Sequence, residues 1–128
     1  MSNIKKAASA EDQLEINRFA RLHKTYIEVK SELSQLNNET QNIADAEDEI
    51  LLLDDEAAAS IPFQIGSIFV HFDQDTISSK LAEGKESNAQ KIAALQKRLN
   101  HLDNELKQLR AVLYAKFGDN IHLEMDEE

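Results

Sequence analysis

The sequence predicts a mostly helical chain in which two long helices pair as an antiparallel coiled coil, with one β-hairpin between them. Two long runs of apolar residues spaced alternately by three and four predict the helices, and a short strand-turn-strand pattern predicts the hairpin. The 128 residues include three Gly, one Pro and no Trp, and 5% are aromatic, which is too little for an ordinary compact core. We therefore expect one all-α dominated domain over residues 1–128.

The first helix is expected from about residue 10 to residue 53. Ser9 followed by Asp12 resembles a capping box, which marks a helix start. From there the apolar positions alternate strictly in spacing, as the seam of a coiled coil does. The seam positions are Phe19, Leu22, Tyr26, Val29, Leu33, Leu36, Thr40, Ile43, Glu47 and Ile50.

The second helix is expected from about residue 75 to residue 117, and Gly118 marks its end. Its seam is almost entirely leucine, with Leu81 in register upstream. The seam positions are Ile92, Leu95, Leu99, Leu102, Leu106, Leu109 and Leu113. Because the two helices match in length, we expect them to fold back on each other, which places Thr40 near Asn88 and Glu47 near Lys85.

A β-hairpin is expected over about residues 61–72. The dipeptide Gly66-Ser67 has the length and chemistry of a two-residue type II′ turn between two apolar runs. That turn sets the register, and six apolar side chains then share one face of the hairpin. The facing pairs are Ile65 with Ile68, Phe63 with Val70, and Ile61 with Phe72.

Charge and composition exclude several classes of partner. The formal net charge of −10 repels a phosphate backbone, so a nucleic-acid partner is not expected. The longest strongly apolar run, Ile50 to Leu53, is far too short to span a bilayer, so no membrane partner is expected. The absence of cysteine agrees with a reducing compartment, and we expect a cytoplasmic protein.

The residue patterns of enzymes and metal sites are missing from the sequence. The four histidines show no ligand spacing, and three scattered glycines cannot form a loop that cradles phosphate. Asp73 and Asp75 begin like a calcium loop, but Ser78 stands where that loop needs glycine. We expect no catalytic residue, no cofactor and no metal.

The hairpin is the first candidate for a functional surface, because an isolated two-stranded ribbon is marginal in water. Hairpins from several chains would satisfy one another by joining into a closed sheet. The alternative is a hairpin that folds down on its own helices. The residues expected to support subunit assembly are Ile61, Phe63, Ile65, Gly66, Ile68, Phe69, Val70 and Phe72.

The second candidate surface is the end of the helix pair where both chain termini meet. Apolar residues there exceed what the seam requires, although packing against Ile16 or Phe19 is an equally good explanation for Phe117. The following tail, residues 119–128, carries five acidic side chains and no Lys or Arg, as a solvated segment does. The candidate contact residues are Leu14, Ile16, Phe19, Tyr114, Phe117, Ile121 and Leu123.

Three stretches of the sequence together resemble the β-class subunits of the prefoldin family, and the likeness spans nearly the whole chain. The hairpin and the terminal Leu-Tyr-Ala-Lys-Phe-Gly segment, in this order, are the specific part. The stretches are Glu11-Asp12-Gln13 with Ile16-Asn17 and Phe19-Ala20; Leu53-Asp54-Asp55 followed by Ile61-Pro62-Phe63-Gln64-Ile65-Gly66; and Leu113-Tyr114-Ala115-Lys116-Phe117-Gly118 with Asn120-Ile121 and Leu123-Glu124.

This resemblance implies a heterohexamer of two α-type and four β-type subunits, in which the hairpins build a β-barrel platform and the coiled-coil tips hold unfolded chains. It implies a co-chaperone that captures unfolded actin and tubulin without ATP and delivers them to the cytosolic group II chaperonin. It also implies that the terminal residues named above contact the client. The alternative is a structural coiled-coil subunit of a tethering or scaffold complex, which heptads alone do not exclude.

Overall fold

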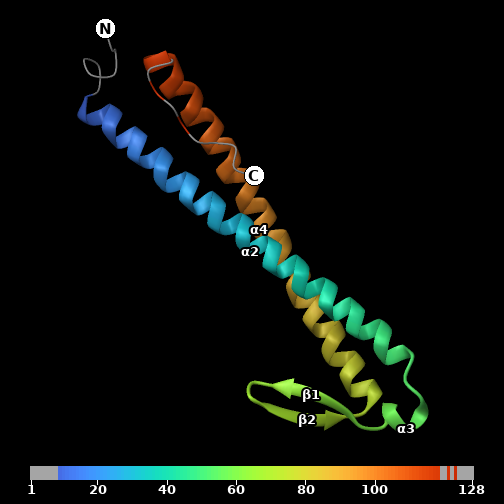
Figure 1. Cartoon of the computed structure of the whole chain (residues 1–128). Helices are drawn as coiled ribbons and strands as arrows, with labels where there is room; N and C mark the ends of the chain where they lie inside the picture. Colours follow the sequence, from blue (N-terminus) through green and yellow to red (C-terminus); the bar gives the residue numbers. More distant parts are fainter. Residues whose placement is uncertain (1–8, 119–120, 122, 124–128) are drawn as a thin grey trace. The chain divides into compact units, whose positions relative to one another are not determined.

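The chain folds into two long antiparallel helices with a two-stranded hairpin between them, which is the predicted fold class. A computed structural model describes residues 9–118, 121 and 123. Apart from Ile121 and Leu123, the predicted acidic tail lies outside the described residues. In chain order the elements are α2 (Ala10–Leu51), α3 (Asp55–Ala58), β1 (Ile61–Ile65), β2 (Ile68–Phe72) and α4 (Gln74–Phe117) (Figure 1).

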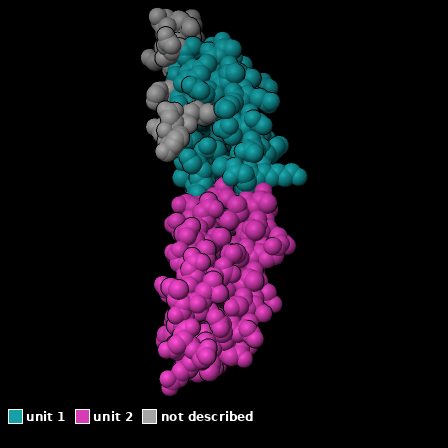
Figure 2. Space-filling model, turned by 90° about the vertical axis from the view of Figure 1, so that its right-hand side faces the viewer, with its two compact units in different colours: residues 1–32, 95–128 teal, residues 33–94 magenta. Residues whose placement is uncertain are grey.

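Two compact units make up the chain (Figure 2). The terminal unit contains residues 1–32 and 95–128, and the hairpin unit contains residues 33–94. Each unit therefore holds one part of α2 packed against one part of α4, and the hairpin unit also holds α3 and both strands.

Helix α2 begins at the predicted capping box. The Asp12 amide donates to Ser9 Oγ at 3.1 Å, and the Ser9 amide donates to Asp12 Oδ2 at 3.2 Å. Each side chain satisfies an amide that the first turn of a helix leaves without a partner.

The other end of α2 comes earlier than predicted, at Leu51 and not at about residue 53. The Leu52 and Leu53 amides donate to carbonyls three residues back, so the last turn tightens and the chain leaves the helix. Gln74, the first residue of α4, donates from its side chain to the Ile50 carbonyl at 3.1 Å. A side chain from α4 thus caps a helix end that lacks both glycine and a basic residue.

Aspartates cap the next two helices. Asp54 accepts from the Ala57 amide at 2.8 Å and starts the one-turn helix α3, which the sequence analysis did not predict. Asp73 accepts from the Thr76 amide at 2.9 Å at the start of α4. Helix α4 ends at Phe117, and Gly118 follows with a φ of 58°, the left-handed conformation expected of a glycine stop.

The terminal unit contains a continuous apolar core. It is built from predicted seam residues of both helices together with Phe117, and Leu106, Leu113 and Phe117 are almost completely buried. The core residues are Phe19, Leu106, Leu109, Leu113 and Phe117.

Polar pairs accompany apolar residues in the seam of the hairpin unit. Asn88 is buried and donates to Thr40 Oγ1 at 3.4 Å and to Glu39 Oε1 at 3.5 Å. Lys85 forms an ion pair with Glu47 at 2.8 Å. The predicted neighbours are confirmed, and because both pairs cross from α2 to α4 they define which residues of the two helices face each other.

Gly84 lies in α4 opposite Ile43. A Cβ on Gly84 would lie 3.4 Å from Ile43 Cδ1, which is the movable end of a flexible side chain. By contrast, Gly66 in the hairpin turn has a φ of 61° with open space around it. The helical glycine has room for a methyl group, and the turn glycine has the room but the wrong backbone conformation for one.

We predict that Gly84→Ala stabilises the protein by about 0.5 to 1 kcal/mol, because alanine loses less conformational entropy in a helix. Gly66→Ala should instead cost about 1 to 2 kcal/mol, since an L-residue is strained at positive φ. Urea unfolding followed by circular dichroism measures both changes. A destabilised Gly84→Ala protein would show that Ile43 cannot move aside.

Candidate assembly surface and client-binding end

The hairpin has the register that the sequence predicted. Strands β1 and β2 pair antiparallel with Phe63 opposite Val70 and Ile65 opposite Ile68. Gly66 has positive φ, whereas Ser67 does not, which matches a type II′ turn because a type I′ turn needs positive φ at both positions. The six predicted apolar side chains therefore share one face.

Exposure differs along that face. At the helix end, Ile61, Phe63, Val70 and Phe72 are partly buried. At the turn end, Ile65 is 47% exposed and Ile68 is 60% exposed. Only the helix end of the apolar face is covered by the chain itself, and the turn end remains exposed.

Aromatic contacts hold the helix end of the hairpin in place. The Phe63 and Phe72 rings pack edge to face with centroids 6.0 Å apart. Lys80 of α4 places its ammonium 5.0 Å from the centre of the Phe72 ring, a cation–π contact. The Phe63 contact joins the two strands, and the Lys80 contact ties β2 to the first turns of α4.

Phe69 lies on the opposite face of the hairpin from the other predicted apolar residues. It pairs with Gln64 across the strands and is 63% exposed. Because side chains alternate between faces along a strand, Phe69 cannot enter an interface together with Val70 on the same side of the sheet.

The candidate residues at the terminal unit divide by burial. Phe19 and Phe117 are core residues with 4% and 1% exposure, so the structure shows the helix-end packing that was one explanation for Phe117. Leu14 is 67% exposed. The other candidates are partly buried at the edge of this core: Ile16, Tyr114, Ile121 and Leu123.

Tyr114 of α4 binds the backbone of Leu123. Its hydroxyl oxygen accepts a hydrogen bond from the Leu123 amide at 3.2 Å, and Arg110 lies 5.4 Å from its ring centre. Ile121 and Leu123 can then pack against the core of the terminal unit. Ile121 and Leu123 therefore extend the apolar core of the terminal unit beyond the last turn of α4.

An ion pair joins the first turn of α2 to the last turn of α4, and the sequence analysis did not find it. Lys116 Nζ donates to Asp12 Oδ1 at 2.6 Å, and Glu15 lies 3.7 Å from the same ammonium. The hydrogen bond from Lys116, aided by the Ser9 amide, lowers the pKa of Asp12 below 3.8. The same bond to Asp12 raises the pKa of Lys116 above 10.5.

Among residues 9–118, 121 and 123, no group of three or more acidic or histidine side chains is placed to hold a metal ion. Within those same residues no helix is long and apolar enough to cross a membrane.

Known proteins resemble this chain over nearly its whole length. A family model described as "Prefoldin subunit" matches residues 13–120. The probable prefoldin subunit 4 of Caenorhabditis elegans is 45% identical over 93% of this chain and 94% of its own length. Prefoldin subunit 4 of Homo sapiens is 39% identical over 98% of both chains. The chain belongs to the prefoldin family, in its subunit 4 branch.

The solved prefoldin β subunit from Thermococcus strain KS-1 has the same fold, with a TM-score of 0.73 over 86% of this chain and 95% of the other. Its sequence is 21% identical, so it supports the fold alone. Family membership confirms the resemblance inferred from the sequence motifs. Prefoldin subunits are non-enzymatic co-chaperone subunits. Membership of this family implies that other prefoldin subunits are partners of this chain.

We predict that Asp12→Asn reduces the loss of stability of this prefoldin subunit in acid. A carboxyl group whose folded-state pKa is lowered stabilises the fold above its unfolded pKa, and this contribution disappears as the pH falls through the lowered value. The wild-type midpoint of urea unfolding should therefore drop more than that of Asp12→Asn between pH 7 and pH values below about 3.8.

Asp48→Asn, at an exposed position of α2, is the matched control. Its urea midpoint should fall in acid by the same amount as that of the wild type. An equal fall of the urea midpoint in the wild type and in Asp12→Asn would contradict a stabilising role for the ion pair between Lys116 and Asp12.

Proposed function

We propose that this chain is one subunit of a cytoplasmic, heterohexameric co-chaperone that holds unfolded actin and tubulin without ATP and delivers them to the cytosolic group II chaperonin. Family membership over nearly the whole chain supports the co-chaperone role. It also favours that role over a tethering or scaffold complex, because the matched relatives are named as prefoldin subunits. The proposal that the chain assembles with other subunits rests on one observation, the exposed apolar side chains at the turn end of the hairpin.

Assembly uses the apolar face of the hairpin. The sheet in the described residues has two strands, so each strand has one edge without a partner. Exposed Ile65 and Ile68 continue the face that Phe63 and Val70 begin. Pairing with hairpins of other prefoldin subunits would bury these side chains at about 25 cal/mol per Å² and complete the strand edges. Six of the eight predicted assembly residues form the apolar face of our proposed interface, Gly66 forms its turn, and Phe69 lies on the opposite face.

Client contact uses the terminal unit. Leu14 is the candidate most available to a client, and Val112, which the sequence analysis missed, is 44% exposed in the same unit. Phe19 and Phe117 support this end from inside its core. Ile16, Tyr114, Ile121 and Leu123 form its partly buried edge. Weak contacts of this kind, repeated at several tips of one complex, give avidity for an unfolded chain while each contact stays easy to release.

We predict that Phe63→Asp combined with Val70→Asp removes the subunit from the hexamer while its helical content stays unchanged. Two buried carboxylates would oppose each other in the interface, and burial of unpaired charge is strongly unfavourable. Size-exclusion chromatography of the co-expressed complex and circular dichroism of the subunit measure the two outcomes.

Gln64→Asp combined with His71→Asp places the same two charges on the other face of the hairpin and should leave assembly intact. A hexamer that retains the Phe63 and Val70 variant would overturn the assignment of this face to assembly.

We predict that Leu14→Ser weakens client holding by roughly fivefold in the assembled complex, because about 1 kcal/mol of apolar burial against the client is lost. The measurement is the amount of complex needed to suppress aggregation of chemically unfolded actin without ATP. Ala82→Ser is the control, since it places the same hydroxyl group at an exposed position of α4 in the hairpin unit. Equal holding by wild type and Leu14→Ser would exclude Leu14 as a contact.

A further inference from the structure

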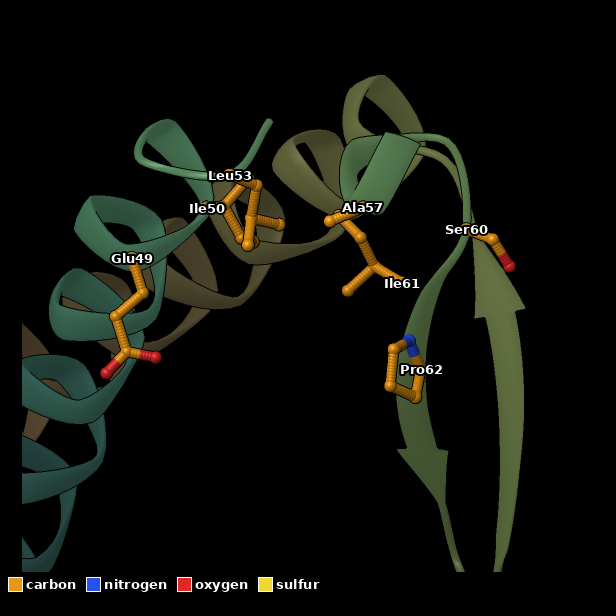
Figure 3. Close-up of a pocket in the computed structure, with 7 residues that line it drawn as sticks. All are labelled: Glu49, Ile50, Leu53, Ala57, Ser60, Ile61 and Pro62. Carbon is orange, nitrogen blue, oxygen red and sulfur yellow. The ribbon is translucent and has the colours of Figure 1, made fainter. Parts of the chain in front are cut away.

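A hollow of about 310 Å³ opens at the end of α2 in the hairpin unit (Figure 3). Ile50 and Leu53 line one side of it, and Ile61 and Pro62 of β1 line the other. Ala57 of α3 lies between them, so the unpredicted one-turn helix forms part of the wall. Most of these side chains are apolar, and the space is sufficient for an apolar side chain from another chain.

Two exposed leucines directly precede Leu53 in the chain. Leu53 in the wall of the hollow is 39% exposed, and the neighbouring Leu51 and Leu52 are 74% and 85% exposed. Clustered large apolar side chains on a surface mark sites of protein contact more often than single ones do. The end of α2 therefore exposes large apolar side chains in addition to those at the turn end of the hairpin.

The stretch of chain that lines the hollow is acidic, and the nearby cations Lys80 and Lys85 lie on α4 of the same unit, against Phe72 and Glu47. From residue 31 to residue 79 the sequence contains no Lys or Arg, and Glu49 itself lines the hollow. The acidic side chains of this stretch are Glu32, Glu39, Asp45, Glu47, Asp48, Glu49, Asp54, Asp55, Glu56, Asp73 and Asp75. A second copy of this chain would bring the same acidic stretch against it, and like charges facing each other disfavour such a contact.

The position of the hollow and the charge of the residues that line it indicate what kind of segment would occupy it. Ile61 belongs both to the wall of the hollow and to the apolar face of the hairpin, so a partner seated on that face also reaches the hollow. We propose that the hollow receives a basic segment of a neighbouring prefoldin subunit, which inserts one apolar side chain and sets Lys or Arg against the acidic rim. This inference rests on the proposed assembly function and adds the chemistry of the neighbour.

Photo-crosslinking in the assembled complex tests the occupant. A benzoylphenylalanine at Ala57, inside the hollow, should label a segment of another subunit that carries Lys or Arg beside an aliphatic or aromatic residue. The same group at the exposed Ala82 of α4 is the control and should not label that segment. Peptide mass spectrometry identifies the labelled segment.

Reversal of the rim charge tests the electrostatic part. Glu49→Lys should raise the concentration at which the subunit leaves the complex by up to about fivefold at low salt, as expected for the loss of one exposed ion pair. The difference should shrink in high salt because ions screen exposed charges. Glu83→Lys, an equal change of charge on an exposed face of α4, should have no such effect.

The outcomes separate this inference from the proposed function. A wild-type chain that forms no hexamer would overturn both. Normal assembly without labelling from Ala57, labelling of an acidic segment, labelling of a second copy of this chain, or labelling only of added unfolded actin would each overturn this inference alone. Equal dissociation of the Glu49→Lys and Glu83→Lys complexes would do the same.

Discussion

The pairing of α2 with α4 in a single register is the constraint on which the other features depend. Leucine seams supply the burial, but a seam with a regular repeat tolerates displacement by one repeat. Polar contacts remove that freedom: Asn88 reaches Thr40 in the hairpin unit, and Lys116 reaches Asp12 in the terminal unit. Each contact would be lost if one helix shifted along the other, which leaves a buried polar group without its partner.

Both candidate surfaces follow from this register. In the terminal unit it brings the first turn of α2 beside the last turn of α4, so Phe117 fills the core and Leu14 remains exposed. In the hairpin unit it sets the end of α2 beside the start of α4, where Gln74 caps the Ile50 carbonyl. The chain between these helix ends must turn back within a short distance, and the hairpin with its partly uncovered apolar face is the result.

Electrostatics then distinguishes among partners that the apolar surfaces alone would accept. Apolar burial supplies association free energy but little selectivity, whereas charge complementarity suppresses wrong pairings. In the proposed complex, the long acidic stretch around α3 and the hairpin would disfavour contacts between identical subunits and favour basic neighbours.

The sequence by itself determined the two helices, the hairpin register and the facing polar pairs, because each depends on local periodicity or on the geometry of a two-residue turn. The prefoldin resemblance also came from local motifs. Tertiary structure decided which apolar residues remain exposed: Phe19 and Phe117 are buried while Leu14 is not, although all three are apolar and near a helix end.

The structure also revealed the Asp12 and Lys116 pair, the early end of α2, helix α3 and the hollow beside Ile61. These features join residues that are distant in the sequence or depend on how the chain leaves a helix. Periodicity records which face of a helix is apolar, but it does not record how deeply a neighbouring element covers that face. That depth of cover is the physical reason why burial, and with it the choice of contact residues, had to come from the tertiary structure.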